Sequence, residues 1–143
     1  MKKNIFLIIF FSLFLSKFAV AADQTVEMLN RLNKESMVFE PKIVRVNVGD
    51  TVLWKATDKG HNVEFIKKGV PDGVDKFKSK YNKDTQYNFT IPGIYAYWCT
   101  PHKNMGMIGF VVVGDDKSNL DEIKKLRFSS KSKKIAPDLI NSL

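Results

Sequence analysis

The sequence contains very few of the residues that cross-link a chain or hold a metal. Its 143 residues include one cysteine and two histidines. A single cysteine excludes an internal disulfide, and this set is too small for a multi-cysteine zinc site. The length suits one domain, and the composition is that of a globular protein. Function must therefore reside in a small number of candidate side chains.

Long hydrophobic runs are also scarce. The run Ile5–Leu15 is shorter than the ~20 residues that a membrane-spanning helix needs. It follows a basic start and precedes the small residues Ala21 and Ala22, as in a secretory leader. We predict that residues 1–22 are a signal peptide, cleaved after Ala22 or Ala21, and that no membrane attachment remains afterwards. The alternative is an uncleaved membrane anchor, against which Lys17 argues.

Positive charge is unevenly distributed along the chain. The formal net charge is +8 for the whole sequence and +5 once the leader is removed. Residues 23–116 hold 13 basic and 12 acidic side chains, whereas residues 117–143 hold 7 and 3. No basic run is interleaved with aromatic residues, so the pattern argues against a nucleic-acid partner.

Short segments rich in β-branched residues follow the leader, with turn signals between them. Their spacing predicts an all-β fold, an antiparallel sandwich or small barrel of seven or eight strands. The polar stretch 72–82 is expected to be a loop with a short helix at most. The expected strands contain Val26 and Met28, Ile43–Val48, Thr51–Trp54, Val63–Ile66, Thr85–Ile91, Ile94–Cys99 and Met107–Val113.

The pattern becomes helical after Gly114. Ser118 or Asn119 can cap a helix that carries acidic residues in its first turn, and a polar connector follows over 128–134. A second short helix is expected from Ala136 to Leu143. Both helices are too short to be stable alone, so we expect them to pack on the sandwich.

One strand–loop–strand segment carries most of the candidate metal ligands. Cys99 ends a strand, His102 follows after two residues, and Met107 stands before the next strand. His61, the other histidine, lies in a distant turn. A His2Cys set with a weak axial methionine is the ligand combination of a blue-copper electron-transfer site.

Each of these residues has an ordinary alternative interpretation. A lone cysteine is usually buried and inert, a lone histidine is usually a surface or core residue, and a methionine at a strand start usually serves packing. Met105 is a rival to Met107, and we interpret Met105 as apolar surface or packing. The combination at strand–loop positions of one sandwich favours the copper interpretation.

The sequence resembles the cupredoxins, and among them the pseudoazurins most closely. The resemblance covers residues 23–143 and includes the two-helix extension, which plastocyanins and amicyanins generally lack. It implies a Greek-key cupredoxin β-sandwich over 23–116, with 117–143 as a helical extension packed on the same domain. It is carried by Met37-Val38-Phe39-Glu40-Pro41, Val48-Gly49-Asp50-Thr51-Val52, Asp58-Lys59-Gly60-His61-Asn62-Val63-Glu64, Lys76-Phe77-Lys78-Ser79-Lys80 and Cys99-Thr100-Pro101-His102 to Met105-Gly106-Met107-Ile108.

The resemblance implies one type 1 copper ion held by four side chains. It implies that Asn62 holds the ligand loops together, with its backbone amide directed at the sulfur of the cysteine ligand, and that Met37 lies near the exposed histidine. The four implied copper ligands are His61, Cys99, His102 and Met107.

Two residues beside these ligands depart from the pattern of the family. Trp98 precedes the cysteine where pseudoazurins often carry lysine, and Lys103 follows the second histidine where an aromatic residue is common. The docking surface therefore cannot be copied from relatives.

The ligand set suits an electron carrier better than an enzyme. Four protein ligands leave no coordination position open for substrate, and no spare histidine remains as a general base. We expect a soluble periplasmic electron carrier that cycles copper between Cu(II) and Cu(I). The alternatives are a periplasmic copper carrier or store, and a cationic interaction protein in which Cys99 is incidental.

The resemblance also implies how a partner would dock. Electrons would leave through the ring of His102, across an apolar surface formed by Gly60, Pro101, Met105 and Gly106. The partner would be a periplasmic redox enzyme, most simply a nitrite reductase, bound transiently to a monomer through a small interface. Candidate lysines for steering an acidic partner are Lys34, Lys59, Lys78, Lys80 and Lys103, of which Lys59 and Lys103 adjoin ligands.

Overall fold

The computed structural model describes residues 23–143. The predicted signal peptide, residues 1–22, lies outside the described residues. Within the described part of the chain, no helix is long and apolar enough to cross a membrane.

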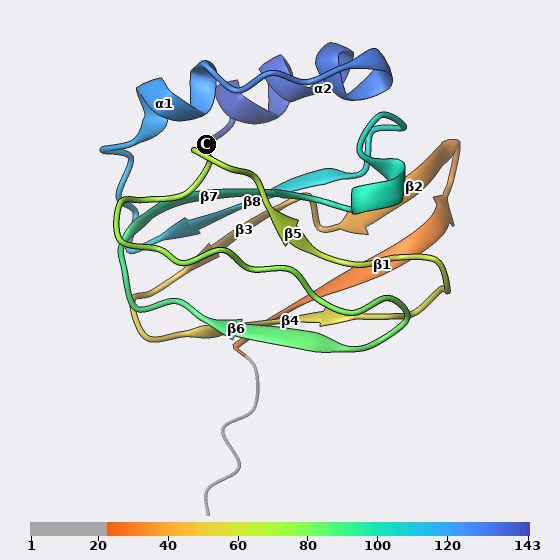
Figure 1. Cartoon of the computed structure of the whole chain (residues 1–143), viewed down its shortest axis with the longest axis horizontal. Coiled ribbons are helices and arrows are strands. Elements are labelled where there is room, and N and C mark those ends of the chain that lie inside the picture. The colour runs from red at the N-terminus through yellow and green to blue at the C-terminus, as the bar shows by residue number, and fades with distance from the viewer. Residues whose placement is uncertain (1–22) are drawn as a thin grey trace, which may run out of the picture.

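Two four-stranded sheets face each other (Figure 1). One has the order β2-β1-β4-β6 and the other the order β3-β8-β7-β5. Parallel pairing of β1 with β4 and of β3 with β8 joins strands that are distant in sequence. The strands are β1 (Gln24–Leu32), β2 (Glu35–Glu40), β3 (Ile43–Val46), β4 (Thr51–Lys55), β5 (Glu64–Phe65), β6 (Thr85–Asn88), β7 (Gly93–Trp98) and β8 (Ile108–Val113).

The alternation of side chains along β7 creates two apolar layers. Successive residues of a strand point to opposite faces. Tyr95 and Tyr97 therefore join the core between the sheets, whereas Ile94 and Ala96 face outward. Cys99 continues the inward series and belongs to the core between the sheets. The register of β7 thus directs the sulfur of Cys99 into the sandwich.

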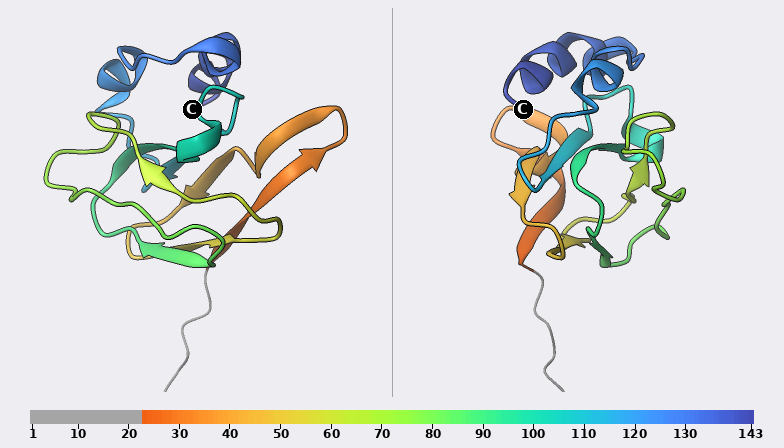
Figure 2. Two further views of the ribbon diagram at one scale, coloured as in Figure 1. Left: turned by 45° about the vertical axis from the view of Figure 1, so that its right-hand side comes forward. Right: turned by 90° about the vertical axis from the view of Figure 1, so that its left-hand side faces the viewer.

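Two helices cover the outward face of the β3-β8-β7-β5 sheet (Figure 2). They are α1 (Leu120–Lys124) and α2 (Ser130–Asn141). Ile123, Ala136 and Ile140 pack there against the outward side chains of the strands. This second layer explains why β8 is buried on both faces along its whole length.

The prediction of seven or eight strands and two short helices is confirmed, and stretch 72–82 is a loop without a helix, as expected. Three other local expectations differ. The strand β2 was not foreseen, because its apolar residues Met37, Val38 and Phe39 are consecutive and do not alternate with polar ones; Met37 there has a left-handed φ of +57°.

The expected start of the second helix is wrong by six residues. It begins at Ser130 rather than Ala136 and contains Pro137 in its interior. An interior proline removes one helical hydrogen bond, and the packing of Ala136 and Ile140 on the sheet offsets that loss. Asn119 precedes α1, but its side chain bonds the backbone of Ile94 instead of capping the helix.

Candidate metal centre

The loop between β7 and β8 closes tightly on itself. After Cys99 comes a short 3-10 turn, η1 (Thr100–His102). The amide of Cys99 donates to the carbonyl of Met107 at 3.0 Å, and the amide of Met107 donates to the carbonyl of His102 at 3.3 Å. These backbone bonds hold the three sequence-predicted ligands of the loop next to one another.

His61 reaches the same place from a turn in the connection between β4 of one sheet and β5 of the other. Gly60 has a φ of +95°, a conformation that glycine adopts without strain. Asn82 secures this turn, since its side chain accepts a hydrogen bond from the Gly60 amide and its amide donates to the His61 carbonyl at 3.0 Å. The turn delivers a fully buried imidazole to the ligand loop.

Three ligand atoms converge at this point. The Nδ1 atoms of His61 and His102 lie 3.2 Å apart, and the sulfur of Cys99 lies 3.7 Å and 3.4 Å from them. Within the described residues, these three side chains form the one group able to hold a metal among histidines, cysteines and carboxylates. A thiolate with two imidazoles suits copper, so the donor set fits the ion that the sequence predicts.

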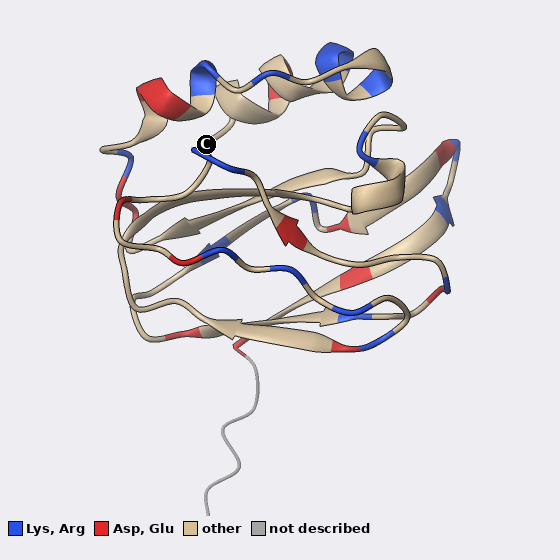
Figure 3. Cartoon of the chain, in the orientation of Figure 1, with Lys and Arg blue, Asp and Glu red and all other residues tan. Residues whose placement is uncertain are grey.

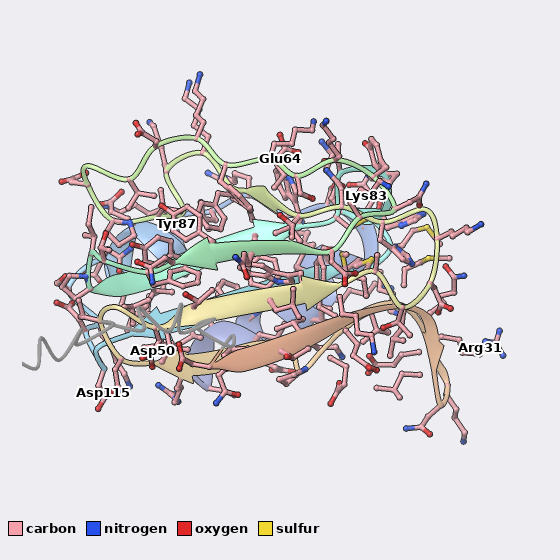
Figure 4. All side chains as sticks on the ribbon, turned by 90° about the horizontal axis from the view of Figure 1, so that it is seen from below. Arg31, Asp50, Glu64, Lys83, Tyr87 and Asp115 are labelled. Carbon is pink, nitrogen blue, oxygen red and sulfur yellow. The ribbon has the colours of Figure 1, made fainter. Side chains whose placement is uncertain are left out.

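Sulfur atoms gather at one end of the sandwich. Figure 4 shows them at the end labelled by Lys83, whereas Asp50 and Asp115 mark the opposite end. Met107 is fully buried and belongs to the same core cluster as Cys99, while Met105 is 42% exposed. The choice of Met107 over Met105 as the predicted ligand therefore agrees with the burial of the two side chains.

Asn62 ties the two ligand-bearing segments together. Its side-chain oxygen accepts a hydrogen bond from the Thr100 amide at 2.9 Å, and its side-chain nitrogen donates to the Thr100 hydroxyl at 3.0 Å. That hydroxyl donates in turn to Glu64 at 2.7 Å. These hydrogen bonds fasten the segment that carries His61 to the loop that carries Cys99 and so fix the distance between the two ligands.

One residue that holds a ligand was not identified from the sequence. The Nε2 atom of His61 lies 3.0 Å from the side-chain oxygen of Asn30 in β1. If Nε2–H donates this bond, Nδ1 keeps its lone pair and faces Cys99 and His102. Such bonds orient metal ligands and fix their tautomer. Nothing in the local sequence around Asn30 signals this role, because it depends on a contact across the fold.

Burial controls the protonation of the three ligands. It raises the pKa of the Cys99 thiol, an effect that bonds from the amides of Asn62 and His102 oppose. Burial also lowers the pKa of His61 and of His102, and each imidazole is thus kept neutral. Neutral imidazoles are ready to bind a metal, whereas the thiol must release a proton when the metal arrives.

A family model described as copper-binding proteins of the plastocyanin/azurin family matches residues 26–114. The pseudoazurin of Paracoccus pantotrophus is 47% identical over 113 residues, which cover 79% of this chain and 78% of that protein. The pseudoazurin of Methylorubrum extorquens is 40% identical over 116 residues, covering 81% and 78%. This chain belongs to the pseudoazurin family.

Solved pseudoazurin structures share the fold. The crystal structure of pseudoazurin from Methylobacterium extorquens AM1 superimposes with a TM-score of 0.78 at 38% identity, covering 85% of this chain and all of that one. Native pseudoazurin from Hyphomicrobium denitrificans gives 0.79 at 37% identity, with coverage of 84% and 97%. Pseudoazurins carry electrons on copper and are not enzymes, which confirms the predicted family, fold class, cofactor and lack of enzymatic activity.

Four of the five predicted docking residues of this pseudoazurin are exposed, in the two segments that carry His61 and His102. Lys59, Pro101, Lys103 and Met105 are exposed. Gly106 is buried instead, because Lys131 and Ile135 of α2 lie over it, so it offers no surface to a partner. His102 is half-buried.

Met37 and Gly60 complete the set of residues singled out from the sequence. Met37 is partly buried and packs against the core between the sheets. A side chain placed on Gly60 would approach the His102 ring to 3.9 Å. The glycine therefore keeps that edge of the ring open.

Proposed function

We propose that this pseudoazurin is a periplasmic carrier that exchanges single electrons through one copper ion and donates them to a nitrite reductase or a similar reductase. We also propose the copper ligands to be the residues predicted from the sequence. The observation that carries the proposal is the convergence of one thiol and two imidazole nitrogens within 4.8 Å of one another. The proposed ligands are His61, Cys99, His102 and Met107.

Copper bound to this set supplies a one-electron redox couple whose tuning depends on the groups around the cysteine sulfur. The protein fixes the positions of the ligand side chains and excludes water from them. Asn62 locks the cysteine loop to the histidine turn, and Asn30 holds the ring of His61. Full burial of Cys99 and His61 excludes water from their ligand atoms.

The half-buried ring of His102 supports its role as the exit for electrons. It is the most accessible of the three converging ligands, and Lys59, Pro101, Lys103 and Met105 lie exposed in the segments beside it. Exposed lysines would speed encounter with an acidic partner. The periplasmic location rests on the predicted leader and on the kinship with pseudoazurins.

The test of the copper assignment is the replacement Cys99→Ser. The oxidised, copper-loaded wild-type protein should show an intense visible band from charge transfer between thiolate and copper, and the variant should lack it. Met105→Leu is the matched control and should keep the band. A wild-type protein that stays colourless with copper would contradict the proposed site.

Electrochemistry and kinetics distinguish a carrier from a copper store. A carrier should oxidise and reduce reversibly while the copper stays bound, whereas a store should bind Cu(I) alone. Stopped-flow mixing of the reduced protein with a purified nitrite reductase should give electron transfer that slows as salt rises, since the lysines are screened. Transfer that does not depend on salt would contradict steering by the lysines.

A further inference from the structure

Trp98 lies next to the proposed metal centre but on the other side of the sheet. It is the last residue of β7 and precedes Cys99, so its side chain points outward while the cysteine points inward. Its indole Nε1 donates to Glu64 at 3.1 Å, and the Lys103 ammonium lies 4.9 Å from the ring centroid. Trp98 is only partly buried and packs against the apolar layer under the helices.

Three hollows meet at this tryptophan. One of about 480 Å³ lies on the side of β5, one of about 310 Å³ lies toward α1, and one of about 160 Å³ lies toward the ligand loop. Trp98 lines all three. Lys67 and Lys68 line the first two, and Arg127 lines the second and third. We call the three together the Trp98 groove.

The rim of the Trp98 groove is positively charged. Seven basic and three acidic residues line it, and two of the acids are already paired, Glu64 with Lys78 and Glu122 with Lys125. Figure 3 shows Lys and Arg along the segment between β5 and β6 and on the helices above it. Among the described residues, five basic residues of the groove have no carboxylate partner, namely Lys67, Lys68, Lys76, Lys103 and Arg127.

The floor of the groove is apolar. Phe65, Ile66 and Phe77 line the hollow beside β5, and the indole of Trp98 forms the junction. Hollows that follow one another suit an extended polypeptide. The positive rim would attract acidic side chains of that polypeptide, and the apolar floor would accept an apolar side chain. A membrane surface fits less well, since the large exposed hydrophobic side chains, Val48, Tyr81 and Met105, lie outside the groove.

We propose that the Trp98 groove is a docking site for an acidic polypeptide segment of a partner protein, with an aromatic or apolar side chain of that segment packed against Trp98. Charge complementarity supplies attraction and orientation, and the indole supplies the buried contact at the centre. The groove adjoins the proposed electron exit and shares Lys103 with it, but it is centred on Trp98 rather than on His102. It does not depend on the proposed electron-transfer function, because binding is measured by itself.

The experiment uses the full-length mature protein, isotopically labelled, copper-loaded and reduced. The probe is a synthetic peptide of glutamates and aspartates around one central tyrosine. At low salt, the indole N–H signal of Trp98 and the amides of Lys67, Lys68 and Arg127 should shift. The indole of Trp54, fully buried between the sheets, is the internal reference and should not shift. A peptide with serine in place of tyrosine should bind more weakly.

Charge reversal supplies the matched comparison. The double variant Lys67→Glu, Arg127→Glu reverses two unpaired positive charges that between them line all three hollows. It should weaken peptide binding by about tenfold or more. The control, Lys55→Glu with Lys83→Glu, makes the same charge change on exposed residues outside the groove and should weaken binding about twofold or less. Trp98→Leu should also weaken binding while Lys67 and Arg127 are intact.

Three outcomes would overturn the proposal. One is a shift pattern centred on Pro101 and Met105 around His102. Another is equal weakening by the groove variant and its control, which would indicate attraction by net charge alone. The third is no shift at low salt. Each is readable whether or not the copper ion exchanges electrons with a reductase.

Discussion

At the scale of single residues, His61 shows how a hydrogen bond to the ring nitrogen away from the proposed metal centre can orient a ligand. One ring nitrogen faces Cys99 and His102, and the other lies 3.0 Å from the Asn30 side chain. The imidazole is fully buried, and burial lowers its pKa, so it is presented to the metal without a charge. Asn30 itself is exposed, and its substitution should therefore affect the metal more than the fold.

Asn30→Ala should lower copper affinity by about 10- to 100-fold, as the loss of a bond behind a metal ligand usually does. The free energy of unfolding of the copper-free protein should fall by about 1 kcal/mol, because the Nε2–H of the fully buried His61 loses its partner. Competition with a chelator measures the affinity, and urea unfolding measures the stability. Asn141→Ala, at an exposed position of α2, is the control. Unchanged affinity in Asn30→Ala would show that the ring is held by packing alone.

At the scale of elements, α2 supports the ligand loop directly. Ser132 is fully buried; its hydroxyl accepts a bond from the Gly106 amide at 3.1 Å and donates to the Lys103 carbonyl. The Lys131 amide donates to the Asn104 carbonyl at 3.1 Å. The first turns of α2 thus bond the stretch between His102 and Met107. This contact explains why the helix begins earlier than its sequence suggests.

Ser132→Ala should destabilise the protein by about 1–3 kcal/mol, because it leaves the buried Gly106 amide without a partner and removes the bond to the Lys103 carbonyl. The same change should alter the visible spectrum of the copper-loaded protein, since the loop between two ligands loses its support. Ser142→Ala is the matched control, as the Ser142 hydroxyl makes its bond to Asp138 at an exposed position. A spectrum identical to wild type would show that α2 stabilises the fold without shaping the metal centre.

At the scale of the whole molecule, the sheet β3-β8-β7-β5 separates two apolar layers. Cys99, Met107 and most of the aromatic rings occupy the layer between the sheets, while the helices close the other layer. We propose that residues 23–116 form the copper-binding domain and that 117–143 are an extension of that same domain. Neither layer is complete without the shared sheet.

Truncation after residue 116 tests this division. It would expose Ile94, Ile108 and Phe110 and the rest of the outward face of the sheet, and exposed apolar patches of this kind promote association. The truncated protein should aggregate or bind an apolar dye, as measured by size-exclusion chromatography and fluorescence. Ile123→Asp, a single change within the same layer, should act in the same direction. A soluble monomer with the wild-type unfolding midpoint would show that 117–143 is dispensable.

Buried tyrosines should make the protein sensitive to alkali. Burial raises the pKa of Tyr95 from 10.0 to about 12 and raises the pKa of Tyr97 as well. Above pH 10 the unfolded chain releases these protons while the folded chain keeps them, so the free energy of unfolding falls as pH rises. Urea unfolding between pH 9 and pH 11 should show this fall, and Tyr97→Phe should reduce its slope. An equal slope in the variant would contradict the assignment to Tyr97.

The candidate copper ligands and the sandwich that carries them are predictable from local sequence. Cys99, His102 and Met107 lie within one strand–loop–strand segment, so their proximity follows from local spacing. Alternating apolar residues predict strands for the same local reason, whereas the consecutive apolar residues Met37, Val38 and Phe39 of β2 do not alternate and were not recognised as a strand.

The contacts that hold His61 and the residues beside the other ligands could be found only in the folded chain. Asn30 with His61, Ser132 with Gly106, and Trp98 with Glu64 are contacts between segments distant in the chain. Such contacts leave no periodic pattern in the sequence, because each depends on how sheets and helices pack. The burial of Gly106 and the early start of α2 were missed for that reason, since both result from the helix packing on the ligand loop.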